Sequence, residues 1–111
     1  MTYNLRVFTF VETKLFTELV GQYLSDDEYL ELQLSLVANP EAGDLVRGSG
    51  GLRKLRWRVA GRGKRGGIRV IYYLRSQKGQ MWMLTLYAKN EEENIPGHIL
   101  KKIKEEIDGK G

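Results

Sequence analysis

In the first part of the chain, apolar residues recur at the period of a helix. They occupy one stripe over residues 15–23 and a second, wider stripe over 30–37, with spacings of three and four residues. Ser25 and Glu28 have the spacing of a capping box immediately before the second stripe, and Pro40 follows it. We therefore expect a helical hairpin that ends before Pro40.

Elsewhere the pattern is typical of strands. Residues 4–10 are rich in Leu, Val, Phe and Thr, and beyond a glycine-rich loop the period changes to two over 53–59, 68–75 and 82–89. From residue 95, isoleucines recur every four residues, which predicts a C-terminal helix. The expected order is therefore β-α-α-β-β-β-α.

This order predicts an α+β domain that covers residues 1–111 as one unit. Short turns between the three late strands favour a mostly antiparallel sheet, with the helices packed on one face and a basic face opposite. In the last strand, alternation places Met83, Thr85, Tyr87 and Lys89 on one side, and Trp82, Leu84, Leu86 and Ala88 on the other. The predicted basic face carries Lys54, Arg56, Arg58, Arg69, Tyr73, Tyr87 and Lys89.

Charge is segregated along the chain. The net charge is +4, but residues 1–44 hold eight acids and two bases, a net of −6. Residues 45–90 hold twelve bases and no acid, a net of +12. Because such a stretch cannot neutralise itself, we expect it to meet a polyanion, with nucleic acid the first candidate. Tyr73 and Tyr87 lie in register with these cations and are candidates for stacking on unpaired bases.

Composition excludes several kinds of chemistry. The chain has no cysteine and only one histidine, His98, which the helical spacing places on the surface of the C-terminal helix. A mechanism with a pair of histidines is therefore excluded, and the predicted strands contain no Asp or Glu to hold a metal. We expect no metal and no cofactor. No apolar run is long enough to span a bilayer, so we expect a cytoplasmic protein with no membrane partner.

A glycine-rich basic turn separates two of the predicted strands. Gly61, Gly63 and Gly66 fit the G-x-G-x-x-G pattern of dinucleotide-binding proteins, but this segment joins two strands and no helix begins after it. We instead expect a turn whose cations contact phosphates. Those cations are Arg62, Lys64 and Arg65.

Three blocks of residues resemble toxins of the RelE superfamily, specifically its HigB-like branch. They are residues 50–56, 63–73 and 84–91, and with the acidic hairpin in front of them the likeness extends over nearly the whole chain. The resemblance implies a small RelE-like domain. It also implies the toxin of a type II toxin-antitoxin pair, which cleaves mRNA in the ribosomal A site without metal and is silenced by a DNA-binding antitoxin.

The resemblance also implies roles for individual residues. Lys54 and Arg56 match the family's two strand cations, Arg69 its phosphate-binding arginine, and Lys89 the base that closes the last strand. Asn90 stands where the best-studied branch has a second base, and no tyrosine lies beyond Tyr87. The general acid is therefore unassigned, with Tyr87 and Arg69 as candidates. The predicted RNA contacts are Arg53, Arg58, Arg62, Lys64, Arg65, Tyr73 and Asn90.

Two functions are compatible with these residues. The first is a ribosome-dependent endoribonuclease, in which the ribose 2′-hydroxyl attacks its own phosphate, Lys54 acts as base, and Arg56 and Arg69 stabilise the developing charge. Its partners are mRNA, ribosomal RNA and an antitoxin. The second is a non-catalytic RNA-binding module that blocks translation by occupancy with the same cations.

Overall fold

The computed structural model describes residues 2–5, 8–59, 67–89 and 97–109. Their elements are β1 (Thr2–Leu5), β2 (Phe8–Glu12), α1 (Lys14–Tyr23), α2 (Asp26–Ala38), β3 (Asp44–Leu45), β4 (Arg53–Trp57), β5 (Ile68–Arg75), a 3-10 turn (Ser76–Lys78), β6 (Gln80–Ala88) and α3 (Gly97–Asp108). The predicted order is confirmed, with two additions: the first strand is a pair, β1 and β2, and a two-residue strand, β3, precedes β4. Among these residues, no helix has the length and apolar character needed to cross a membrane.

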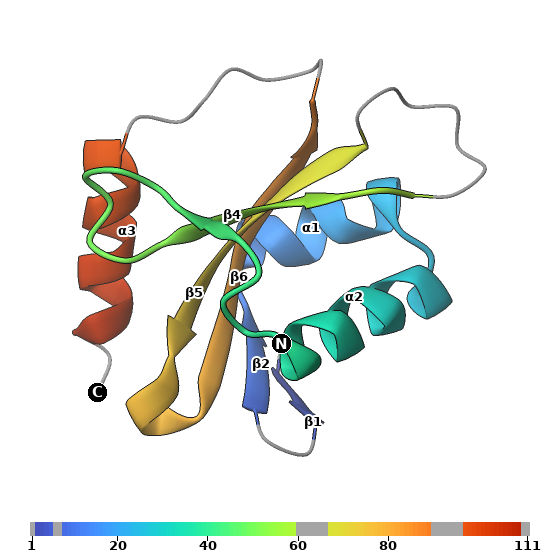
Figure 1. Cartoon of the computed structure of the whole chain (residues 1–111), viewed down its shortest axis with the longest axis horizontal. Helices are drawn as coiled ribbons and strands as arrows, with labels where there is room; N and C mark the ends of the chain where they lie inside the picture. Colours follow the sequence, from blue (N-terminus) through green and yellow to red (C-terminus); the bar gives the residue numbers. More distant parts are fainter. Residues whose placement is uncertain (1, 6–7, 60–66, 90–96, 110–111) are drawn as a thin grey trace.

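One six-stranded sheet organises the molecule, in the order β1-β2-β6-β5-β4-β3. Only the β2–β6 pair is parallel, and every other neighbouring pair is antiparallel. The predicted mostly antiparallel sheet is therefore confirmed. The three strands of the predicted basic face, β4, β5 and β6, are neighbours in the sheet, and the N-terminal strands β1 and β2 extend it beyond β6 (Figure 1). We refer to β4, β5 and β6 as the basic strands.

The capping signal read from the sequence is realised at α2. The Ser25 N–H donates to Glu28 Oε1 at 2.7 Å, and the Glu28 N–H donates to Ser25 Oγ at 3.2 Å, so both arms of the capping box are present. At α1 the side chain of Thr13 caps the helix by accepting from the Phe16 N–H at 3.1 Å. The Thr13 hydroxyl also donates to Leu84 O at 2.7 Å, which joins the start of α1 to β6.

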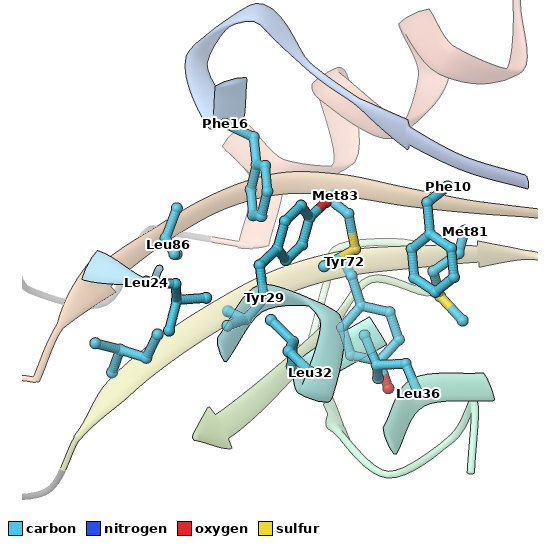
Figure 2. Packing of buried hydrophobic residues seen from close by; sticks show 12 residues of the cluster. Phe10, Phe16, Leu24, Tyr29, Leu32, Leu36, Tyr72, Met81, Met83 and Leu86 are labelled. Atoms are coloured by element: carbon cyan, nitrogen blue, oxygen red, sulfur yellow. The ribbon is translucent and has the colours of Figure 1, made fainter. Parts of the chain in front are cut away.

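The main core lies between the sheet and the α1–α2 hairpin. Its apolar side chains come from both helices, from the turn between them and from β2, β5 and β6, and they include Phe10, Phe16, Leu24, Tyr29, Leu32, Leu36, Tyr72, Met81, Met83 and Leu86 (Figure 2). Leu55 and Trp57 of β4 pack against this cluster from the edge. In β4 and β5, every second residue thereby packs on this core, which leaves the residues between them for the opposite face.

The helix α3 covers part of that opposite face. Leu100 and Ile107 of α3 pack with Ile71, Leu84 and Tyr87 in a second apolar cluster. The expectation that all helices share one face is therefore wrong for α3, because β5 and β6 carry apolar residues on both faces. Figure 1 shows α3 on the side of the sheet away from α1 and α2, so this helix shares its side of the sheet with the predicted basic face.

A register shift in β5–β6 changes the alternation predicted for the last strand. The shift falls between Ile71 and Tyr72. Met83 and Leu86 belong to the cluster under α1 and α2, whereas Leu84 and Tyr87 belong to the cluster under α3. Strict alternation would put Met83 on the same side as Tyr87, so this part of the prediction is wrong. An extra residue in one strand reverses the faces of those beyond it.

Candidate nucleic-acid interface

Three of the predicted site residues form one row across the basic strands. Arg56 of β4 pairs in register with Arg69 of β5, and Arg69 pairs in turn with Tyr87 of β6. Side chains directly opposite on neighbouring strands have Cβ atoms about 4.5–5.5 Å apart. The structure thus brings together residues that lie up to 31 positions apart in the sequence.

The row faces the side of the sheet on which α3 lies. Arg69 stands between Ile68 and Val70, both of which are buried in the main core, so its own side chain points the other way. Arg69 is half-buried, and its Nη1 donates to Ile68 O at 3.3 Å. Arg56 is exposed. Two like charges directly opposite each other destabilise a sheet, so the pair favours an anionic ligand between them.

Lys54 lies two residues from Arg56 on the same face of β4. Its cross-strand partners are Ile71 on β5 and Asp44 on β3. Asp44 falls in the segment expected to be a loop, because a two-residue strand leaves no periodic signal. The pairing of β3 with β4 therefore brings one acid to the edge of the basic face, a feature that the sequence did not reveal.

Arg53 lies on the opposite face, although it is among the predicted RNA contacts. Its Nη1 donates to Gly43 O at 2.7 Å and to Glu41 O at 3.3 Å, and its Nη2 lies 3.3 Å from Glu41 Oε2. The side chain is only 16% exposed. The structure therefore does not bring Arg53 to the row, and its guanidinium instead holds the loop that precedes β3.

Tyr73 is on the same side as the row but is held by α3. Its hydroxyl donates to Asp108 Oδ1 at 3.0 Å, and Lys104 Nζ lies 5.3 Å from the centre of its ring. Burial, followed by the hydrogen bond to Asp108, raises the pKa of Tyr73 above its usual value. With one edge bonded and one face under a lysine, this ring anchors α3.

Asp108 is the centre of that anchor. Lys104 Nζ donates to Asp108 Oδ2 at 2.8 Å, and Arg75 Nε lies 3.6 Å from Oδ1. The hydrogen bond from Lys104 is the main cause of a lowered pKa at Asp108, and it raises the pKa of Lys104. These residues were not predicted, since only the docking of α3 on β5 brings them together.

Tyr87 is placed differently from the two arginines of its row. It is 4% exposed and lies in the apolar cluster with Leu84 and Leu100. Its ring is therefore packed in the sheet beside Arg69, while Arg56 projects into solvent.

The remaining predicted residues lie toward one end of the strands. Arg58 and Lys89 are exposed, and the Lys89 N–H donates to Gly67 O at 3.3 Å. Arg62, Lys64, Arg65 and Asn90 lie outside the described residues, as does the G-x-G-x-x-G segment 61–66. His98 is exposed on α3, as predicted. In the parts of the chain that the structure describes, no group of three or more His, Asp or Glu could hold a metal ion.

No family model matches the chain. Among solved structures, it is similar to a chain of the intact E. coli RelBE toxin-antitoxin complex, with a TM-score of 0.55 and 16% identity over 78% of this chain and 100% of that chain. The fold is that of RelE.

Two further RelE structures agree. The isolated E. coli RelE toxin has a TM-score of 0.55 and 14% identity, over 92% of this chain and 99% of that one. A double arginine-to-alanine mutant of E. coli RelE in the free state has a TM-score of 0.53 and 17% identity, over 95% and 98% of the two chains. The RelE-like fold expected from the sequence is therefore confirmed, while the assignment to a HigB-like branch stays a prediction.

Proposed function

We propose that this chain is the toxin of a type II toxin-antitoxin pair and acts as an endoribonuclease on mRNA in the ribosomal A site. The observation that carries the proposal is the row formed by Arg56, Arg69 and Tyr87, with Lys54 beside it, on a sheet of RelE-like fold. Cations that the fold brings to one place before the substrate arrives can stabilise developing negative charge at a low reorganisation cost. No cofactor is part of the proposal.

The proposed reaction is transfer of a phosphodiester to the neighbouring 2′-hydroxyl. Lys54 takes the proton of the 2′-hydroxyl, whose oxygen attacks the adjacent phosphorus, and Arg56 and Arg69 hold the charge that builds on the non-bridging oxygens. The bond from phosphorus to the 5′-oxygen then breaks, which leaves a 2′,3′-cyclic phosphate, and the 5′-oxygen takes up one proton to become a hydroxyl. Because Tyr87 is buried, Arg69 is the better placed of the two candidate donors.

The proposed partners follow from the same fold and surface. RelE is found with its antitoxin in the RelBE complex, and we propose an acidic, DNA-binding antitoxin for this chain. An acidic protein would neutralise the row while bound, since opposite potentials favour association. We propose the cytoplasm as the location, since that is where mRNA and ribosomes are found.

One observation favours a second candidate, a module that binds RNA and blocks translation by occupancy. The chain has a single histidine, which lies exposed on α3, and the tyrosine of the row is buried. Side chains of ordinary acid-base catalysis are therefore scarce around the row. A binding module needs only the cations.

Mapping of new 5′-hydroxyl ends on mRNA in a purified translation system separates the two candidates. We expect cleavage by the wild type and a loss of about 10²–10³-fold in rate for Arg69→Ala, the usual cost of removing one donor to the developing charge. Lys14→Ala removes the same charge from the exposed start of α1 and serves as the matched control. Cleavage by Arg69→Ala at the wild-type rate contradicts the proposed mechanism, whereas inhibition of translation without new ends establishes the binding module.

A further inference from the structure

The loop between β3 and β4 crosses the surface of α3. A Cβ at Gly50 would lie 3.3 Å from Lys104 Cδ and 3.6 Å from Lys101 Cγ, so the backbone of the loop rests on the stems of these lysines. Figure 1 shows the backbone of the loop passing over α3. At the start of α3, Gly97 packs against the carbonyl oxygen of Arg47. Loop and helix thus form one continuous surface.

The loop is held in this position by its own hydrogen bonds. Ser49 is fully buried, and its hydroxyl donates to Val46 O at 2.7 Å and accepts from the Leu52 N–H at 3.0 Å. The Val46 N–H donates to Leu52 O at 2.9 Å and closes the base of the loop. Leu52 is buried in the cluster under α3. The loop therefore presents its outer residues from a fixed base.

The exposed surface of the loop and of the adjoining part of α3 consists of cations and glycines. Gly48, Gly50 and Gly51 all have positive φ, a conformation that favours glycine, and as glycines they place no side chain over the middle of the surface. Arg47 and Lys101 are exposed at its sides, and neither forms an ion pair with a carboxylate within the described residues. Lys104 is already paired with Asp108. Two cations thus flank a stretch of main chain that no exposed side chain covers.

This surface adjoins the row of the candidate interface. The loop leads directly into β4, where Lys54 and Arg56 face the same side of the sheet as α3. A strand of RNA that crosses the row can continue over the loop without changing face. Glycine at the centre also lets a phosphate approach the main chain closely, whereas a protein partner needs an apolar anchor in a pocket, which these residues do not offer.

We propose that Arg47, Lys101 and loop residues 48–51 form a second RNA site that binds the phosphate backbone independently of sequence. We refer to these residues as the loop–helix surface. The inference rests on the proposed function, because it extends the path of the same RNA beyond the residues that act on the scissile phosphate. Its ligand is the backbone of structured RNA, and it contributes affinity and orientation without taking part in the reaction.

The test uses an RNA hairpin that carries a fluorescent label and is 2′-O-methylated throughout, so that it cannot be cleaved. Binding is followed by fluorescence anisotropy at KCl concentrations from about 50 to 200 mM, the range over which counterion release is measured. For Arg47→Ala and Lys101→Ala we expect Kd to rise about 5- to 10-fold, and the slope of log K against log salt to fall by about one each. Arg47→Lys should restore binding, because a phosphate contact needs only the charge.

Lys102→Ala is the matched control. Lys102 is exposed on the same helix and its loss changes the net charge equally, but it lies about 100° around the helix from Lys101, away from the loop. An equal loss of affinity for Lys102→Ala and Lys101→Ala would mean that net charge alone is responsible, and would overturn the inference. The inference also fails if the salt slopes of both loop–helix variants equal that of the wild type, or if poly-glutamate binds the surface in preference to the hairpin.

The readout separates this inference from the proposed function. Since the hairpin cannot be cut, a wild type that binds it through Arg47 and Lys101 but cuts no mRNA contradicts the nuclease and leaves the loop–helix surface standing. A wild type that cuts mRNA, with hairpin binding that neither variant weakens, contradicts only the loop–helix surface.

Discussion

Removing one hydroxyl from each of two adjacent tyrosines tests how the two faces of the sheet are stabilised. Tyr72 is fully buried in the main core; its hydroxyl donates to Pro40 O at 2.8 Å and accepts from the Gly43 N–H at 2.9 Å. Tyr72→Phe leaves both backbone groups without their partner. Each buried polar group without a partner costs about 1–3 kcal/mol, and Pro40 is only half-buried, so we expect a loss of about 2–3 kcal/mol in all.

Tyr73→Phe makes the same chemical change on the other face. The Tyr73 hydroxyl has one partner, Asp108, whose side chain is 38% exposed and can bond to water instead. We therefore expect a loss of no more than about 1 kcal/mol. Urea denaturation measures both variants, with an unchanged m-value as the condition for the comparison. At about 4 °C per kcal/mol, the melting temperature should fall by about 8–12 °C for Tyr72→Phe and by no more than about 4 °C for Tyr73→Phe.

Equal losses for the two variants would refute this reasoning. They would mean that the Pro40 and Gly43 groups find water as easily as Asp108 does, and that the loop before β3 is not held by Tyr72. A larger loss for Tyr73→Phe would mean that the anchoring of α3, rather than the main core, determines stability.

Three further changes have outcomes set by the structure. Leu100 lies on the side of α3 that faces the sheet and is 1% exposed, so Leu100→Ala should lower the free energy of unfolding by about 2–5 kcal/mol, as measured by urea denaturation. A smaller loss would mean that α3 is barely packed on the sheet. Gly67 has a φ of +66° and its missing Cβ would meet a neighbouring strand's backbone, so Gly67→Ala should destabilise by more than about 1 kcal/mol. The control Gly21→Ala, in α1 with open space around it, should stabilise by about 0.5–1 kcal/mol, and the same sign for both would contradict the argument. The hydrogen bond from Lys104 lowers the pKa of Asp108 below its ordinary value, so this pair stabilises the fold above the unfolded pKa and its contribution disappears as pH falls through the folded one. The free energy of unfolding of Asp108→Asn should therefore fall less on acidification than that of the wild type. The difference should be no more than about 1 kcal/mol, because the Asp108 side chain is 38% exposed. Identical pH profiles would show that the pair contributes nothing.

Local signals in the sequence were sufficient for the elements and for the cations of the row. Helical and strand periods, the capping box before α2 and the acid-free stretch from 45 to 90 are all properties of neighbouring residues, so they predicted the order of elements and the mostly antiparallel sheet. Alternation along β4 and β5 also placed Arg56 and Arg69 on a common face, because both strands commit their other side to the main core.

What neighbouring residues do not encode was decided by the tertiary structure. The periodicity of α3 shows that the helix has an apolar stripe but not which face of the sheet receives it, and Ile71 and Leu84 placed it on the side of the row. The register shift in β5–β6 and the pairing of Asp44 with Lys54 depend on hydrogen bonds between distant strands. Arg53 and Tyr73 were predicted to contact RNA, but Arg53 bonds to the loop before β3 and Tyr73 bonds to Asp108. These contacts also join segments that are distant in the sequence, so no local pattern indicated them. The sequence by itself thus determined the strands that carry positive charge, and the packing of α3 and of the loops determined which side chains of those strands are bound within the fold, as Arg53 and Tyr73 are.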